Sequence, residues 1–406
     1  MTGVYPLKGT VKHYDWGGLS FIPSLLNIDN KDNKPFAEYW MGTHPLGNSI
    51  IETTSGNKKL DELAGNLPYL FKAQEVKEML SIQAHPSKAD AEKEFARENA
   101  EGILLDAPHR NYKDDNHKPE MLVALSDFWL LHGFKPPKEL GYTLLNVVQL
   151  RELLPIYNES GYTGLYKHIM EMPQAEVNRI LQPLVDCVIP IYNKGDHDKD
   201  DEDYWAAKAA LTFNKPSISS PASHIPHPDN KQSVNIDRGI FSIYLFNLVH
   251  LKKGEGIFQD AGVPHAYLEG KNVELMANSD NVLRGGLTSK HIDVNELLKH
   301  VKCEPTRVNI LRGKKINDIE RVYETPAPDF QISLFDMKAG ETASFIPVTT
   351  EIVLLTDGIV ELSNEDQQLE LKYGKPSAVA FSGKAVDLTA VTDATVFRAS
   401  VPVNIR

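Results

Sequence analysis

The segment "SIQAHP", residues 81–86, places a carboxamide and an imidazole two residues apart, at Gln83 and His85, in a run that is typical of a strand. Alternate side chains of a strand lie on one face of a sheet, so Ser81, Gln83 and His85 are expected to point in the same direction. These residues alone leave two interpretations open. They are ordinary polar residues on a half-buried strand, or they are one half of a metal site.

Two further segments contain residue types that bind metals. In "NHKPEM", Pro119 favours an extended Lys118, and Lys118 and Glu120 then share a face. In "GEGIFQDAGVPHAYLEG", His265 follows the turn-forming residues "AGVP". Histidine, glutamate and a neutral oxygen donor together suit Zn²⁺, with one position left open for water or substrate.

The spacing of Gly254, Gly262 and His265 fits the second half of a cupin pattern, although Asp260 replaces a proline that is usual there. The first half is irregular, because Gln-x-His stands where His-x-His is common and the glutamate lies far downstream. The spacing by itself therefore leaves a metal-binding β-barrel and an ordinary β structure as alternatives.

The elements that must position these residues change along the chain. Residues 1–130 contain strand-length apolar segments and one helix, "HPSKADAEKEFARENAEGI", which Ser87 is expected to cap. Residues 136–212 have apolar residues at three- and four-residue spacing, which predicts helices. A charged connector within them holds His197, which is a candidate metal ligand, although such runs are usually solvated.

From residue 238 onward strands return, in "GIFSIYLFNLVHL", "GEGIFQDAGVPHAYL" and "VELMA", and "VNELLKHV" predicts a short helix. Residues 320–406 are rich in strand-like segments, and "DG" inside one of them predicts a hairpin turn. A helical block thus interrupts a β-rich body. We therefore predict a discontinuous barrel of residues 1–135 and 213–318, an inserted helical domain of residues 136–212, and a C-terminal barrel of residues 319–406.

The bulk properties exclude several classes of protein. The 406 residues include 43 basic and 55 acidic ones, a net charge of −12, which argues against nucleic-acid binding but not against a small anionic ligand in a basic cleft. The two cysteines form no disulfide framework, which favours a reducing cytoplasm. The first residues lack the apolar core of a signal peptide, and no run is long enough to span a membrane.

Six segments resemble, in order, the signature stretches of type I mannose-6-phosphate isomerases, also called phosphomannose isomerases. They are "HYDWGG", "AEYWMGTHP", "LPYLFK", "LSIQAHPSK", "NYKDDNHKPEM" and "AGVPHAYLEGKNVELMANSDNVLRGGLTSK". The strong resemblance covers roughly residues 9–133 and 238–292. It implies a mainly β fold of cupin-type double-stranded β-helix (jelly-roll) barrels with an α-helical insertion, and it makes the C-terminal barrel cupin-like.

The resemblance also implies chemistry. The family is a zinc-dependent aldose–ketose isomerase that interconverts mannose 6-phosphate and fructose 6-phosphate through an enediol. Its motif positions fall on Gln83, His85, Glu120 and His265 as ligands of one Zn²⁺ per chain. The expected partner is a small sugar phosphate, with no nucleic acid or membrane, and the expected state is a monomer or weak homo-oligomer.

The remaining site residues are implied in the same way. Arg284 and Lys290 are expected to hold the phosphate, with a hydrogen bond from Ser81 and additional positive charge from Lys72. Arg284 is also a candidate for opening the sugar ring.

Proton transfer needs a base near the sugar carbonyl, and Glu274 and Lys118 are the candidates. The resemblance does not choose between them, and we favour Glu274. The supporting residues are expected to be Asp280, Tyr267 and His117.

Two tryptophans lie in these motifs, and two positions depart from the family pattern. Trp40 is expected to pack in the core, whereas Trp16 either lines the sugar site or packs. Asp260 adds polarity beside His265 and is expected to tune it. Ser289 replaces a frequent proline before Lys290.

Two other functions remain as alternatives. One is another metal-dependent cupin enzyme, such as an oxygenase, and the other is a non-catalytic cupin that binds a sugar phosphate. Arg284 and Lys290 argue against the first, and turnover of mannose 6-phosphate would exclude the second. The C-terminal barrel is expected to lack metal, because residues 320–406 contain no histidine.

Overall fold

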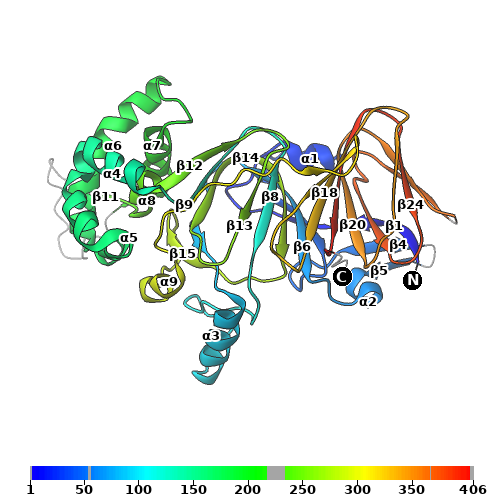
Figure 1. Ribbon diagram of the computed structural model, residues 1–406, viewed down its shortest axis with the longest axis horizontal. Coiled ribbons are helices and arrows are strands. Elements are labelled where there is room, and N and C mark those ends of the chain that lie inside the picture. The colour runs from blue at the N-terminus through cyan, green and yellow to red at the C-terminus, as the bar shows by residue number, and fades with distance from the viewer. Residues whose placement is uncertain (1, 54–55, 217–233, 366, 403–406) are drawn as a thin grey trace.

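The computed structural model describes residues 2–53, 56–216, 234–365 and 367–402. Figure 1 shows helices at one end of the long axis, a strand-rich body in the middle, and further sheets at the other end. This arrangement confirms the predicted fold class, a mainly β protein with a helical insertion. Among the described helices, none combines the length and apolar composition that crossing a bilayer requires.

The central body is an antiparallel sheet that curls on itself. Its strands are β2 (Thr10–Lys12), β3 (Glu38–Gly42), β6 (Tyr69–Val76), β7 (Ile82–Ala84), β8 (Glu120–Ala124), β9 (Phe128–Phe134), β12 (Phe246–Leu251), β13 (Gly256–Gln259), β14 (His265–Ala277) and β15 (Leu283–Gly286). The first half of β14 pairs with β7 and β9, whereas its second half pairs with β6 and β8. One long strand therefore belongs to both walls of the barrel.

A glycine lets β14 change walls. Gly270 lies between the two halves with φ of 133°. A Cβ there would meet the carbonyl oxygen of Asp127 at 2.6 Å and the ring of Phe128 at 2.6 Å, so only glycine fits. The bend allows residues from both halves of β14 to face the same interior.

The barrel interior is apolar at depth and polar at its mouth. The buried apolar residues that fill it are Val76, Leu122, Ala124, Phe128, Leu130, Val249, Leu251, Ile257 and Tyr267. Leu122 and Ala124 alternate along β8 with Met121 and Val123, which pack in a separate cluster against the C-terminal barrel. Glu120 has the same parity as Leu122, so the strand period turns its carboxylate inward.

Helices fill the chain between β9 and residue 213, as predicted. They are α4 (Pro137–Asn146), the 3₁₀ helix η1 (Val148–Leu153), α5 (Leu154–Glu171), α6 (Gln174–Lys194) and α7 (Glu202–Phe213), and a short two-stranded ribbon, β10 (Lys215–Pro216) and β11 (Val234–Asn235), follows. Their apolar faces share one core cluster with residues of the barrel wall such as Leu131 and Ile82.

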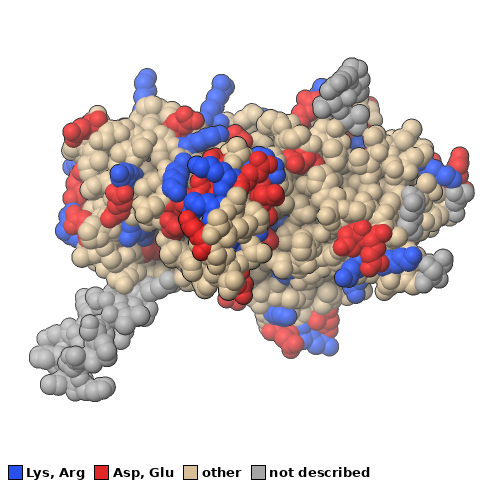
Figure 2. Space-filling view, turned by 90° about the horizontal axis from the view of Figure 1, so that it is seen from below, with Lys and Arg blue, Asp and Glu red and all other residues tan. Residues whose placement is uncertain are grey.

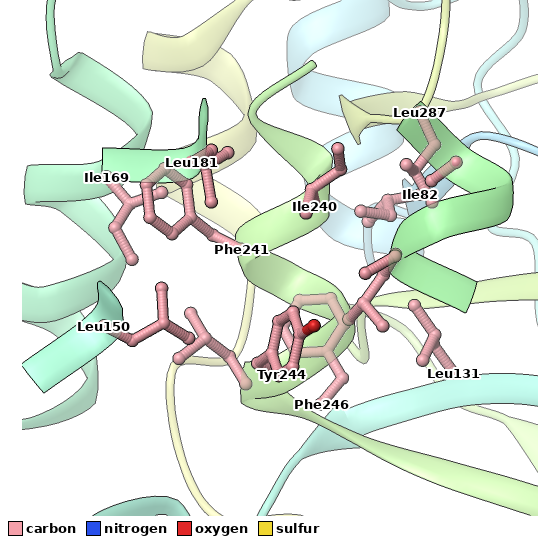
Figure 3. Close-up of a cluster of buried hydrophobic side chains, with 14 of the residues drawn as sticks. Ile82, Leu131, Leu150, Ile169, Leu181, Ile240, Phe241, Tyr244, Phe246 and Leu287 are labelled. Atoms are coloured by element: carbon pink, nitrogen blue, oxygen red, sulfur yellow. The ribbon is translucent and has the colours of Figure 1, made fainter. Parts of the chain in front are cut away.

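One predicted strand is wrong in its first half. "GIFSIYL" forms the helix α8 (Gly239–Leu245), and only the following residues form strand β12. Figure 3 shows Phe241 directed toward Ile169 and Leu181, whereas Ile240 lies nearer to Ile82 and Leu287. Every residue of α8 is buried between the helices and the barrel, so its sequence is apolar except for Ser242 and carries no helical period.

Four more helices lie on the barrel and its loops: α1 (Phe21–Leu25), α2 (Leu60–Ala64), α3 (Lys88–Ala100) and α9 (Val294–His300). The capping prediction is confirmed, because the Ser87 side chain accepts a hydrogen bond from the amide of Asp90 at the start of α3. The short helix predicted in "VNELLKHV" is confirmed as α9.

The C-terminal part is built from two further sheets. One contains β1 (Gly3–Lys8), β4 (Ile50–Thr53), β5 (Gly56–Lys59), β16 (Lys314–Lys315), β17 (Glu320–Tyr323), β18 (Gln331–Met337), β20 (Glu351–Asp357), β23 (Ser377–Phe381) and β25 (Ala394–Ser400). The other contains β19 (Thr342–Phe345), β21 (Val360–Ser363), β22 (Gln368–Leu371) and β24 (Val386–Ala390). Strand β1 pairs with β23, so the N-terminal segment joins the C-terminal sheet.

The predicted hairpin at "DG" is wrong. Asp357 ends β20, which pairs with β23 and β25, whereas β21 begins at Val360 and pairs with β22 and β24. Gly358, with φ of 85°, therefore turns the chain from one sheet to the other. The local turn chemistry was interpreted correctly, but the strand partners depend on the whole barrel.

Candidate functional site

Three side chains of metal-binding type meet at the mouth of the central barrel. The ligand atoms of His85, Glu120 and His265 all lie within 4.8 Å of one another, and all three residues are buried. Nε2 of His85 is 3.4 Å from Oε1 of Glu120, and Nε2 of His265 is 3.3 Å from Oε2 of the same carboxylate. His85 follows β7, Glu120 begins β8 and His265 begins β14, so three strands deliver them to one point.

The hydrogen bonds of the two histidines indicate where their protons are. Nδ1 of His85 lies 2.8 Å from the carbonyl oxygen of Asn281, and Nδ1 of His265 lies 3.0 Å from that of Val263. A carbonyl oxygen only accepts, so each Nδ1 carries a proton and donates it. Burial lowers the pKa of His85 to about 4, so this ring is neutral near pH 7.

These tautomers turn two nitrogen lone pairs toward an anion. Nε2 of His85 is buried without a hydrogen-bond partner, and it faces a Glu120 oxygen that is also an acceptor. An arrangement of lone pairs against a carboxylate is unfavourable unless a cation lies among them. The donor set of two imidazoles and one carboxylate therefore fits a divalent metal such as Zn²⁺.

The structure brings Gln83 to the same place. Gln83 lies in β7 directly opposite His265 of β14 on one side and Arg284 of β15 on the other. It lines a deep cavity of about 60 Å³ together with Glu120 and His265. The neutral carboxamide oxygen of Gln83 is thus available as a further ligand beside the two imidazoles and the carboxylate.

A buried ion pair lies on the wall of this cavity that β3, β6 and the second half of β14 form. Nζ of Lys72 is 2.7 Å from Oε1 of Glu274, and the Tyr267 hydroxyl donates to Oε2 of Glu274 at 2.8 Å. Burial raises the pKa of Glu274, because the ionised carboxylate loses hydration there. Although burial opposes its charge, Lys72 has a raised pKa, because Glu274 and Glu38 both favour the ammonium form.

Sequence reasoning missed two residues of this wall, Glu38 and Gln74. The Glu38 carboxylate accepts from the indole of Trp40 at 2.6 Å and from the amide of Gln74 at 2.8 Å, and it lies 3.7 Å from Nζ of Lys72. The sequence signal for Glu38 was its position two residues before Trp40, which places both side chains on one face of a strand. In the structure every residue of this strand is buried. Trp40 is itself buried, in agreement with the expected packing role.

A wider cavity of about 560 Å³ adjoins the deep one and shares Gln83 with it. Ser81, Arg284, Lys290 and Trp16 line it. Burial lowers the pKa of Arg284 with no carboxylate to offset it, and its Nε is buried without a partner. The pKa of Lys290 is also lowered, by burial and by Arg284. Arg284 and Lys290 repel each other, and neither forms an ion pair with a described residue, so the two cations are suited to an anionic ligand.

Neighbouring residues of the "NHKPE" segment have different orientations. Lys118 lines the deep cavity, and its Nζ lies 3.2 Å from Oε1 of Glu120. His117 does not join this group, because its Nε2 lies 2.9 Å from the Asp329 carboxylate and it lines neither cavity. Successive side chains of an extended segment point to opposite faces, so only one of this pair can face the metal-type ligands.

Asp280 lies beside the cavities rather than in their walls. Its carboxylate is 3.2 Å from Nε2 of His44. Burial raises its pKa, but the hydrogen bond from His44 and the charges of Lys118 and Lys72 outweigh this effect, and the net pKa is lowered. Asp280 is therefore ionised near neutral pH.

The expectation that Asp260 tunes His265 is wrong. Asp260 is exposed in the turn after β13, and its carboxylate lies 3.0 Å from Nζ of Lys302. The preceding residue, Gln259, is buried instead, and its side-chain Oε1 lies 2.7 Å from Nδ1 of His132. The strand period turns Gln259 inward and Asp260 outward.

His197 lies in a second group of ligand-type residues, with Asp201 and Asp203. Asp201 caps the start of α7 by accepting from the amide of Asp203, and the Asp203 carboxylate accepts from the Tyr244 hydroxyl at 2.6 Å. These protein contacts account for both carboxylates, so we assign no metal to this group.

Comparisons with known proteins identify what the chain is similar to. Residues 4–137 match the family model described as phosphomannose isomerase type I, catalytic domain. The chain is 33% identical over 399 residues to mannose-6-phosphate isomerase of Escherichia coli (strain K12), covering 92% of this chain and 94% of that protein. It is 31% identical over 438 residues to the Homo sapiens mannose-6-phosphate isomerase, covering 98% of each chain. It also superposes with a TM-score of 0.83 and 30% identity on a crystal structure of mannose 6-phosphate isomerase from Salmonella typhimurium bound to substrate (F6P) and zinc, covering 99% of this chain and 100% of that one.

Proposed function

The chain belongs to the type I phosphomannose isomerase family, and we propose on this basis that it interconverts mannose 6-phosphate and fructose 6-phosphate with one bound Zn²⁺. The observation that carries the proposal is the pair of histidine lone pairs turned toward Glu120. Next to them is a cavity in which Arg284 and Lys290 form no ion pair with any residue that the structure describes. An oxygenase needs no such anion pocket, so this alternative is not favoured.

We propose that Gln83, His85, Glu120 and His265 hold the zinc. With one carboxylate among four ligands, the centre would keep a net charge of about +1. A bound Zn²⁺ would supply Lewis acidity, which polarises a sugar oxygen and stabilises negative charge that develops on it. The Nδ1–H bonds to the carbonyl groups of Asn281 and Val263 orient the two imidazoles for this task.

The phosphate of the substrate would occupy the wider cavity. Arg284 offers a planar fork of donors and Lys290 a point charge, and Ser81 adds a hydroxyl on the same face of the strand as Gln83. Trp16 lines this cavity, which supports the interpretation that it contacts the sugar or its ester. The local positive charge explains how a chain of net charge −12 would attract a dianion.

The proton transfer between C2 and C1 would fall to Glu274. Its raised pKa makes it a stronger base than an exposed carboxylate, and its position in the deep cavity brings it to the same small volume as the zinc ligands. Lys72 and Tyr267 hold one oxygen each and keep the carboxylate in a single orientation. Lys118, on the Glu120 side of the cavity, remains the second candidate for the base.

The experiment that tests this function is a coupled assay for fructose 6-phosphate produced from mannose 6-phosphate. We expect turnover that disappears on chelation and returns when zinc is added back. Binding of mannose 6-phosphate without turnover by the zinc-loaded protein would favour the non-catalytic alternative and overturn the proposal. Oxygen uptake in the presence of a reduced metal would favour the oxygenase.

We also propose the predicted division into a discontinuous catalytic barrel, an inserted helical domain and a C-terminal cupin-like barrel, with the N-terminal strands β1, β4 and β5 assigned to the C-terminal barrel instead of the catalytic one. A cytoplasmic location is supported by the two cysteines, Cys187 and Cys303, which are both free. On the face drawn in Figure 2, basic and acidic side chains are interspersed, and this face offers no broad basic surface for a nucleic acid. The monomeric or weakly oligomeric state stays a prediction, which light scattering would test.

A further inference from the structure

A fully buried asparagine connects the two loops that surround the candidate metal centre. Asn281 lies in the loop between β14 and β15, and none of its surface is exposed. Its backbone carbonyl accepts the Nδ1–H of His85 at 2.8 Å, so the position of this residue sets the orientation of that imidazole.

The side chain of Asn281 is bonded to a different loop. Its Oδ1 accepts from the amides of Lys113 at 2.7 Å and Asp114 at 3.3 Å. Its Nδ2 donates to the carbonyl groups of Asp114 at 2.8 Å and Asn116 at 2.9 Å. The carboxamide thus uses both of its donors and both of its acceptor positions, all on the segment that leads into Lys118 and Glu120.

The Asp114 carboxylate ties the same two loops together from the other side. It accepts from the Ser279 hydroxyl at 2.8 Å and from the amide of Asp280 at 2.7 Å. Ser279 in turn accepts from the amide of Asn281 at 3.2 Å. These bonds are buried or partly buried, where hydrogen bonds are strong and unpaired groups are costly.

Regular structure does not hold the first loop in place. No helix or strand is assigned between the end of α3 at Ala100 and the start of β8 at Glu120. Glu120 itself pairs with Gln259 of β13 and Met276 of β14, so the strand ladder fixes its backbone. The hydrogen bonds of Asn281 hold the segment of residues 113–116 that leads into β8.

We infer that Asn281 is a positioning residue that clamps the loop before Glu120 onto the carbonyl that orients His85, and that it thereby sets the geometry of the zinc ligands. The relevance of this residue to catalysis rests on the proposed function. The hydrogen bonds of Asn281 are present without a metal, and their effect on zinc affinity can be measured independently of activity. Asn281 touches neither substrate nor metal in this role.

The test uses Asn281→Ala, with Asn30→Ala as a control. The Nδ2 of Asn30 donates to the carbonyl groups of Leu19 and Lys34, and its Oδ1 accepts from the amide of Lys34, so its carboxamide also ties two chain segments. None of these residues pairs with a strand that carries a proposed zinc ligand. Three quantities are measured for each variant: the zinc dissociation constant by competition with a chelator, the thermal midpoint, and amide hydrogen exchange of Lys113 and Asp114 in the metal-free protein.

We expect Asn281→Ala to weaken zinc binding by about 10- to 100-fold, the usual effect of removing a group that orients metal ligands. The amides of Lys113 and Asp114 should exchange faster, because they lose their acceptor. Asn30→Ala should change the zinc dissociation constant less than twofold, whatever its effect on the thermal midpoint.

Two results would overturn the inference. One is wild-type zinc affinity in Asn281→Ala, and the other is an equal loss of affinity in both variants, which would indicate general destabilisation. If Asn281→Ala does not fold, Asp114→Ala cuts the same clamp from the other loop and must weaken zinc binding in the same range. An inactive wild-type enzyme with the expected loss of zinc affinity in Asn281→Ala would refute the isomerase function and leave the clamp standing.

Discussion

Replacement of Arg284 by alanine tests the anion pocket most directly. Its guanidinium is half-buried, its Nε has no hydrogen-bond partner, and no carboxylate offsets the burial that lowers its pKa. A phosphate dianion would supply the missing acceptors through a two-bond fork. A hydrogen bond to a charged group contributes about 1.5–3 kcal/mol. The lower value applies to a half-buried group, so the two bonds together amount to about 3 kcal/mol.

This energy predicts the kinetic effect of Arg284→Ala. Since about 1.36 kcal/mol corresponds to a tenfold change in rate, kcat/KM for mannose 6-phosphate should fall by about 100-fold. Arg284→Lys keeps the charge and loses the fork, and it should show an intermediate loss of about 10-fold. The zinc content of both variants should equal that of the wild type, because Arg284 lies in the wider cavity and is not a ligand.

The assay is the coupled measurement of fructose 6-phosphate, combined with inhibition by inorganic phosphate. The inhibition constant for phosphate should rise in parallel with the loss of kcat/KM if the guanidinium binds the ester. Arg238→Ala is the control, because Arg238 is also half-buried but donates to the carbonyl groups of Ile169 and Met170. The reasoning would be refuted by an Arg284→Ala enzyme whose kcat/KM and phosphate inhibition both stay within threefold of wild type.

Three further predictions concern the metal, the C-terminal barrel and a helix cap. Gln83→Ala and His265→Ala should each lose zinc and activity together, and elemental analysis of the dialysed variants would contradict the ligand assignment if zinc stayed at one per chain. Burial raises the pKa of Glu351 from 4.5 to about 7. The folded value lies above the unfolded one, so the free energy of unfolding is greatest below about pH 4.5 and falls by up to about 3 kcal/mol as the pH rises through 7. Glu351→Gln should remove this fall in urea titrations at pH 5 and pH 8, and an unchanged difference between the two would disprove the assignment. Ser87→Ala should lower the free energy of unfolding by about 1 kcal/mol, measured by the same urea titration, because α3 loses its cap. An unchanged free energy of unfolding would mean that water replaces the serine hydroxyl as the acceptor for the Asp90 amide.

Local patterns predicted most elements because the signals act over a few residues. The capping serine of α3, the helical periods of residues 136–212 and the alternation around Gln83 each depend on neighbours in the chain. The errors have the opposite origin. "GIFSIYL" is apolar except for the small Ser242 because both sides of α8 are covered, and the period that distinguishes a helix from a strand vanishes under such burial. Asp357–Gly358 turns as expected, but which strands it joins is decided by partners far along the chain.

The sequence by itself determined the family, the fold class and the residue types of the site, because a metal of this kind and a sugar phosphate require particular donors and cations. Only the tertiary structure decided how they meet. His85 and Asn281 are 196 positions apart, yet one hydrogen bond between them fixes the proton on the imidazole and turns its lone pair toward Glu120. The contacts of Glu38 with Gln74 and Lys72 arise in the same way, from strands that become neighbours only when the barrel closes. No local period encodes such contacts, because their energy depends on burial and on the charges that other segments bring to the same small volume.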